Sequence, residues 1–273
     1  MYTNRRLSLV AVLCAAAASV MIACGGSGPS APSTTATTTT STTTTPTTPT
    51  PTTPSMPLLE SLPVNLATLD YAAIVAHRTA FDAEWLPLGD FGFIIPASSV
   101  RPTPQANPQP TFYAPLGTPV VAIVSGVVTS ITTLYSSDFS VMVGASSGSS
   151  GPFWEMEHVI NVRVRVGDTV VAGQTIADVS NYECAWARNS LATDPICLSR
   201  LGLVEMGLLY GGATPEHRCP FDTDVVAPSK KDAIFGQLDA ARARIEAAFG
   251  DASKYNEVSR ASSQCITLAR VPG

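Results

Sequence analysis

The chain has 273 residues, 45% of them hydrophobic, and a formal net charge of −5. That apolar content is sufficient for a packed core and excludes a chain that is disordered throughout. Only 14% of the residues are charged and acids outnumber bases, so the chain lacks the basic surface of nucleic-acid-binding proteins, and no nucleic-acid partner is expected.

The N-terminus has the pattern of a secretory signal. Two arginines precede an apolar stretch, residues 7–23, which is short for a membrane span. The letters MIAC end this stretch at Cys24 and are similar to the bacterial lipobox, in which the cysteine is acylated. We therefore expect residues 1–23 to be a lipoprotein signal peptide and Cys24 to anchor the chain to a bacterial membrane, in the cell envelope and outside the cytoplasm. An uncleaved anchor and an ordinary signal peptide are the alternatives.

A low-complexity segment follows. Residues 34–53 contain fifteen threonines, and no charged residue occurs between Cys24 and Glu60. Such a composition cannot bury a core and favours an extended, solvated chain. We expect residues 24–56 to be a disordered Thr/Pro-rich tether and residues 57–273 to be the folded head.

The first half of the head alternates strand and turn signals. Residues 71–76 are interpreted as an early strand, and the proline-rich residues 101–110 as a loop. Residues 112–135 are rich in Val, Ile and Thr and are interrupted by glycine, which predicts strand, turn and strand.

Further strands are expected over residues 139–144 and 153–159, joined by a Gly/Ser loop. In residues 162–166 valine alternates with arginine, which predicts a strand with its valines on one face. Gly167 and Gly173 mark tight turns.

One amphipathic helix is expected near the C-terminus. Its apolar residues recur at helical spacing from Ile234 to Phe249, and Gly250 offers a C-cap. Ser229 and Asp232 resemble a capping box at its start. The head is therefore predicted to be mainly β, with this helix packed against the sheet.

Four cysteines are left after the signal is removed and Cys24 is acylated. An even number in an exported domain favours two disulfides. Pairing of Cys184 with Cys197 and of Cys219 with Cys265 is preferred among three connectivities. A four-cysteine zinc site is the rival, although the chain has no C-x-x-C pair.

The strings APLGTPVVAIVSGVVTSI at residues 114–131 and EHVINVRVRVGDTVVAGQTIADV at residues 157–179 closely resemble the LytM/lysostaphin-type zinc peptidase domain. The resemblance covers about residues 107–180 and implies a barrel-sandwich hybrid β fold, the duplicated hybrid motif. Lipoyl and biotinyl carriers share this fold, but they need a lysine on an exposed hairpin. Residues 57–229 contain no lysine, which argues against a carrier.

In the LytM/lysostaphin family, zinc is held by an H-x-x-x-D motif and by the second histidine of an H-x-H motif. The resemblance places these three ligands at Asn107, Thr111 and Leu203, and it places the first histidine of H-x-H at Leu201. Zinc is bound by Cys, His, Asp or Glu, so this set is not competent. Of the family's catalytic positions His158 alone is retained. We expect the fold without the zinc cofactor or the peptidase site.

A rearranged zinc site is the alternative, with His158 and His217 as ligands beside a glutamate. Strand alternation places Glu155 and Glu157 on one face and His158 on the opposite one, which disfavours a chelate between neighbours. His77 is expected to be structural, inside the early strand.

Two functions follow from the resemblance. In the first, the head of an envelope lipoprotein is not catalytic and binds peptidoglycan or a cell-wall hydrolase. In the second, the head is an active zinc endopeptidase that cleaves peptidoglycan peptides, with His158 as general base or electrophile. A purely structural envelope lipoprotein is a third option. The expected lining of the binding groove is His158, Tyr113, Trp154, Glu155, Glu157, Glu205 and Trp186.

Overall fold

The computed structural model describes residues 56–81, 87–92, 94–95, 102–182, 200–211, 216–250 and 270–272. The signal peptide, the tether, Trp186 and every cysteine except Cys219 lie outside these residues, so the anchor and the disulfide pairing stay predictions. Cys219 is buried in the core. Within the described part, no helix combines the length and apolar character needed to cross a bilayer.

The helical elements are η1 (Leu66–Thr68), α1 (Tyr71–Phe81) and α4 (Lys231–Phe249). The strands of the first half are β1 (Leu88–Gly89), β2 (Ile94–Ile95), β3 (Gln105–Ala106), β4 (Thr111–Pro115), β5 (Pro119–Val121), β6 (Gly126–Thr133) and β7 (Phe139–Gly144). The later strands are β8 (Phe153–Ile160), β9 (Thr169–Val170), β10 (Thr175–Val179), β11 (Leu201–Tyr210), β12 (Glu216–Arg218) and β13 (Arg270–Pro272).

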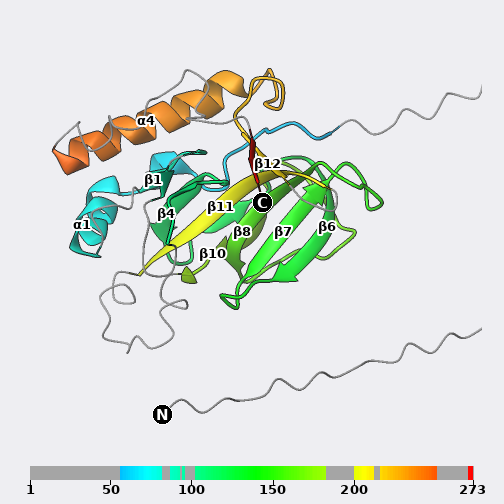
Figure 1. Cartoon of the computed structure of the whole chain (residues 1–273), viewed down its shortest axis with the longest axis horizontal. Coiled ribbons are helices and arrows are strands. Elements are labelled where there is room, and N and C mark those ends of the chain that lie inside the picture. Colours follow the sequence, from blue (N-terminus) through cyan, green and yellow to red (C-terminus); the bar gives the residue numbers. More distant parts are fainter. Residues whose placement is uncertain are drawn as a thin grey trace, which may run out of the picture. The chain divides into compact units, whose positions relative to one another are not determined.

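One antiparallel sheet dominates the described residues (Figure 1). Its strand order is β1-β4-β11-β8-β7-β6-β9, and β5, β10, β12 and β13 pair onto this path. The strand β11 lies between β4 and β8, although it follows both in sequence. The prediction of a mainly β head with a C-terminal helix is confirmed.

Of the three strands expected between residues 139 and 166, two are confirmed and the third is wrong. The strands β7 and β8 lie where alternating apolar residues predicted them. Residues 162–166 do not form a strand, because only Val164 of their three valines is buried and Val166 is 60% exposed. The chain leaves the sheet here and turns at Gly167, whose φ of +94° suits glycine.

The predicted early strand is wrong, because residues 71–81 form the helix α1. Tyr71, Ile74 and Val75 are buried at helical spacing, whereas His77 is exposed. The side chain of Asp70 caps the helix by accepting a hydrogen bond from the backbone N–H of Ala73 at 3.1 Å. Both signals are present in the sequence, so a helix could have been predicted from them.

The helix α4 has the buried face that its spacing predicted, since Ile234, Leu238, Ala241 and Ile245 are all buried. It ends at Gly250, in the left-handed conformation with φ +66°. The predicted capping box is wrong: Lys230 is the N-cap and makes no side-chain capping bond. The expected packing against the sheet is also wrong, because α4 packs mainly on α1 and η1 (Figure 1).

A buried ion pair ties α4 to the residues after β1. The guanidinium of Arg242 donates to the carboxylate of Asp90, and both side chains are almost completely buried. Removing one partner of such a pair leaves an uncompensated buried charge, which costs about 3–5 kcal/mol. The pair therefore links α4 to the segment that follows β1.

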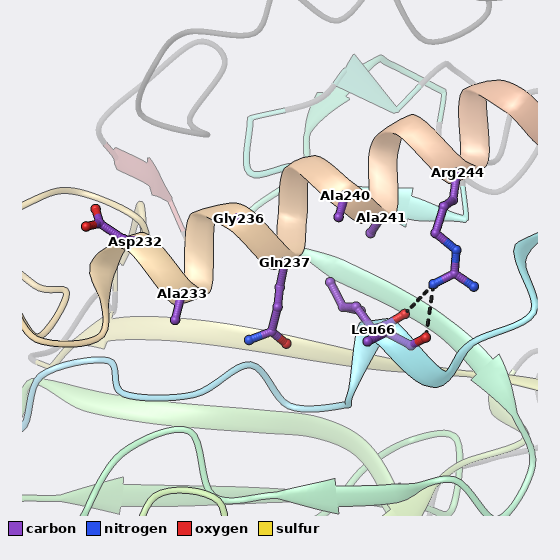
Figure 2. A pocket seen from close by; sticks show the side chains of 9 residues that line it. Leu66, Asp232, Ala233, Gly236, Gln237, Ala240, Ala241 and Arg244 are labelled. Atoms are coloured by element: carbon purple, nitrogen blue, oxygen red, sulfur yellow. Dashed lines mark hydrogen bonds between the residues drawn. The ribbon is translucent and has the colours of Figure 1, made fainter.

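A shallow groove of about 260 Å³ runs between α4 and η1 (Figure 2). Arg244 closes one end by donating to the carbonyls of Leu66 and Ala67 at 3.3 and 3.1 Å. Small side chains line the helix side, and a Cβ placed on Gly236 would meet no atom within 4 Å.

Gly236→Ala is expected to stabilise the head by roughly 0.5–1 kcal/mol, because alanine restricts the unfolded chain and has room in the groove. Gly250→Ala is the matched control and should destabilise, since its φ of +66° disfavours a Cβ. Urea denaturation of both variants measures the two changes. A destabilised Gly236→Ala would contradict the open space around this position.

Candidate functional site

Strand register brings three glutamates together on one face of the sheet. Glu205 on β11 pairs with Glu157 on β8, and Glu155 lies two residues earlier on β8, opposite Gly207. On its other side Glu205 pairs with Thr111 of β4. Facing pairs in an antiparallel sheet have Cβ atoms about 5 Å apart, so like charges there repel. We call Glu155, Glu157 and Glu205 the glutamate cluster.

His158 joins this cluster because β8 is irregular at that position. The β7–β8 register shifts between the pairs Phe139–Val159 and Val141–Met156, and His158 has φ +57°. A bulge of this kind redirects the side chain that follows it. The Nε2 atom of His158 therefore lies 4.0 Å from a carboxylate oxygen of Glu205. The prediction that His158 faces away from Glu157 is wrong, since strict alternation fails at a bulge.

Asp138 holds the other ring nitrogen of His158. The Nδ1 atom of His158 is 3.0 Å from Oδ2 of Asp138, and that same oxygen accepts from the hydroxyl of Ser180 at 2.6 Å. Ser136 donates to the second oxygen. Burial alone would raise the pKa of Asp138, but the hydrogen bonds from His158, Ser136 and Ser180 lower it below its usual value.

Two tyrosines flank the imidazole. The ring of Tyr182 lies 3.8 Å from that of His158 between centroids, and its hydroxyl contacts the hydroxyl of Tyr135 at 2.9 Å. His158 is almost completely buried, whereas Tyr135 is 56% exposed. Tyr135 is thus the exposed part of this face.

Gln109 bridges two members of the cluster. Its Nε2 atom donates to Glu155 at 3.1 Å and to Glu157 at 2.8 Å, and Ser140 donates to the second oxygen of Glu155. Both carboxylates therefore lie within about 3 Å of one nitrogen. Burial raises the pKa of Glu155 well above its usual range, and the charge of Glu157 raises it further.

Glu205 and His158 influence each other's protonation. Burial raises the pKa of Glu205 to about 8; the charge of His158 opposes this shift, and the charges of the neighbouring carboxylates add to it. Burial lowers the pKa of His158, but the hydrogen bond to Asp138 and the charges of Glu205 and Glu157 raise it above the usual value. Both shifts favour the protonated form of each group.

His217 lies beside Gln109, since a Cβ on Gly207 would meet Gln109 Nε2 at 3.2 Å and His217 Nδ1 at 3.3 Å, but it is not a neighbour of His158. On β11, Leu209 pairs with His217 of β12 on one side and with Phe153 of β8 on the other. Two interstrand spacings and five residues along β8 separate its Cα from that of His158 by about 18 Å. Burial lowers the pKa of His217 to about 4. The alternative zinc site on the two histidines is therefore not assembled.

The positions that the family resemblance assigns to zinc ligands do not fit the metal. Asn107 donates through Nδ2 to the carbonyl of Asp90 at 3.3 Å and to the hydroxyl of Thr111 at 3.4 Å. Leu203 is buried in the core and has no ligand atom. Across the described part of the chain, no three His, Cys, Asp or Glu side chains are arranged to hold a metal.

The predicted groove lining is partly wrong. Tyr113 and Trp154 are completely buried in the core, and the indole of Trp154 donates to the carbonyl of Pro57 at 2.7 Å. The glutamate cluster does gather around His158, as register requires. Sequence reasoning missed the partners of these residues, which are Asp138, Gln109, Tyr135 and Tyr182; no motif marks them, because loops far apart in sequence supply them.

Comparison with known proteins gives a family match over part of the chain. Residues 110–191 match the model of peptidase family M23. The catalytic domain of the prophage-encoded M23 protein EnpA from Enterococcus faecalis is similar at 21% identity and a TM-score of 0.34, covering 51% of this chain and 93% of that one.

Two further solved structures are similar at the same level. LytU is 22% identical with a TM-score of 0.34, over 46% of this chain and 75% of its own. Lysostaphin is 18% identical with a TM-score of 0.32, over 59% of this chain and 54% of its own. No curated protein matches the sequence.

Asp138→Asn is expected to lower the pKa of His158, because it removes the charge and the hydrogen bond that favour the imidazolium. NMR titration of the imidazole resonances measures this pKa. Ser136→Ala is the control: it removes one hydrogen bond to Asp138 but keeps the charge, so the pKa of His158 should move less. An unchanged His158 pKa in Asp138→Asn would show that the pairing is absent.

Proposed function

We propose, from the premise that residues 110–191 are a LytM-like domain of the peptidase M23 family, that this head binds the cell wall without cleaving it. Peptidoglycan is the proposed partner. The competing result would be that the head binds a cell-wall hydrolase when no wall material is present. The domain type is that of cell-wall proteins, while the absence of catalysis and the identity of the partner belong to the proposal.

The observation that carries the proposal is what occupies the three positions that the family resemblance assigns to zinc ligands. Asn107 and Thr111 are hydrogen-bonded to each other, and Leu203 is part of the core. A catalytic zinc site needs three protein ligands and an open position for water. These side chains instead stabilise the junction between β4 and the strands beside it. The retained His158 is closed in by Asp138 and Tyr182.

The proposed contact surface is the exposed part of the same face. Tyr135 is largely exposed, and the side chains of Glu157 and Glu205 are partly exposed. An aromatic ring beside carboxylates offers both stacking area and hydrogen-bond acceptors to a sugar or peptide. The lipid anchor at Cys24 and the tether would place this surface outside the cytoplasm, within reach of the wall.

Co-sedimentation of the full chain with purified sacculi tests the function. We expect binding, and we expect Tyr135→Ala to weaken it by about tenfold, as loss of one central aromatic contact does. Val171→Ala is the matched control, because Val171 is 62% exposed but lies at the opposite end of β6, where β9 pairs. Equal weakening of sacculus binding by both variants would refute this contact surface. No sacculus binding by the wild type would refute the function.

The zinc content of the same preparation separates the two candidate functions. The full chain, purified without a metal column, should contain far less than one zinc per chain, both as isolated and after incubation with zinc and dialysis. Near-stoichiometric zinc, together with release of peptides from sacculi, would overturn the proposal in favour of a peptidase. Mutation of His158 to alanine would then show whether that residue takes part.

A further inference from the structure

The strand β6 pairs with β7 along its length on one side, but on its other side it is paired only at its beginning (Figure 1). There, β9 pairs with its first residues, and the backbone of Val128 donates to Asp168 at 2.9 Å and accepts from Gly167 at 2.8 Å. Beyond Val128, none of the residues that the structure describes pairs with this outer side. Thr132 and Thr133 are exposed. The second half of β6 is therefore an edge strand.

The hairpin that follows β6 shows which backbone groups face outward. The N–H of Leu134 donates to the carbonyl of Asp138 at 2.8 Å, so the backbone of Leu134 faces the hairpin partner. Backbone groups alternate between the two sides of an antiparallel strand, so those of Thr132 also face β7. Those of Ile131 and Thr133 face outward. Each of these two residues thus offers a donor and an acceptor to an added strand, about 7 Å apart along the edge.

The free part of β6 lacks the side chains that usually prevent edge strands from pairing. Residues 126–137 contain no charged residue and no proline, whereas the chain as a whole has a net charge of −5. The register shift between Val128 and Ser130 precedes this part, so residues 130–133 pair regularly with β7. Two copies of an acidic chain repel each other, but a neutral edge lets them meet without placing like charges opposite each other.

We propose that the free edge of β6 binds the same edge of a second copy of this chain, as an antiparallel pair around a two-fold axis at Thr132. In this register, Ile131 of each copy exchanges hydrogen bonds with Thr133 of the other copy, so the outward groups of both residues obtain partners. Thr132 lies opposite its symmetry mate in a non-hydrogen-bonded pair, with Cα atoms about 4.5 Å apart. Threonine pairs at such positions are favourable.

This pairing leaves the proposed wall-binding surface free. Tyr135 follows the edge, but its hydroxyl contacts that of Tyr182 and its ring lies edge-on to His158 at 6.4 Å between centroids. The hydroxyls of Ser130 and Thr132 are 3.1 Å apart on the same side of the strand and would lie beside those of the second copy. The dimer stands without the proposed function. If that function holds, one wall-binding surface on each copy increases avidity for a polymer with repeated sites.

Disulfide cross-linking of the full chain tests the pairing. Thr132→Cys places each cysteine opposite its symmetry mate, at a Cα distance that a disulfide spans, so mild oxidation should yield a linked dimer. Ser130→Cys is the matched control on the same side of β6, because its two Cα atoms would be about 14 Å apart. We expect at least about tenfold more linked dimer from Thr132→Cys than from Ser130→Cys or from the wild type.

A second substitution in the Thr132→Cys chain tests the backbone hydrogen bonds. Thr133→Pro removes an outward N–H but no bond to β7, so the linked dimer should fall to the wild-type level. Thr133→Ala keeps the N–H and should leave the yield unchanged. Thermal unfolding shows that each variant is folded.

Equal yields of linked dimer from Thr132→Cys and Ser130→Cys would overturn the dimer, and so would an undiminished yield in a folded Thr133→Pro variant. Should Thr133→Pro fail to fold, the comparison of the two cysteine variants decides. Sacculus binding is measured separately on the wild type. Loss of sacculus binding with cross-linking intact would refute the proposed function and leave the dimer standing.

Discussion

The bulge in β8 determines which side chains meet on the functional face. Without the left-handed backbone at His158, alternation would direct the imidazole away from Glu157. With it, one histidine contacts Asp138 on one side and Glu205 on the other. The hydrogen bonds, the stacking of Tyr182 and the raised proton affinities all depend on that local change of direction.

The positions that the family resemblance assigns to zinc ligands make contacts of their own in this structure. At the ligand positions, Asn107 and Thr111 form a hydrogen bond and Leu203 contributes apolar area to the core. Neither contact involves a metal ligand. The charged side chains on the neighbouring part of the sheet are Glu155, Glu157 and Glu205, which gather around His158.

The helices support this face from a distance. The helix α4 packs on α1 and η1, and the buried pair of Arg242 with Asp90 joins it to the residues after β1. The strand β1 pairs with β4, and β4 pairs with β11. A continuous series of contacts therefore joins the helix pair to the strand that carries Glu205.

Local patterns in the sequence determined much of the fold. The strands β7 and β8, the turn at Gly167 and the buried face of α4 depend on contacts and periodicities within a few residues, and all were predictable. The helix α1 was predictable too, from Asp70 and the spacing of its apolar residues, but the short apolar run was interpreted as a strand. The family resemblance also predicted that Asn107, Thr111 and Leu203 stand at the zinc-ligand positions, and this assignment stays a prediction.

Only the tertiary structure decided the composition of the site. About fifty residues separate Glu155 from Glu205, and their proximity depends on the register of β11 between β4 and β8. The direction of the His158 side chain depends on a bulge in β8. The buried indole of Trp154 depends on its hydrogen bond to the carbonyl of Pro57. Strand register and bulges arise from long-range pairing, which the hydrophobic pattern of a single segment does not encode.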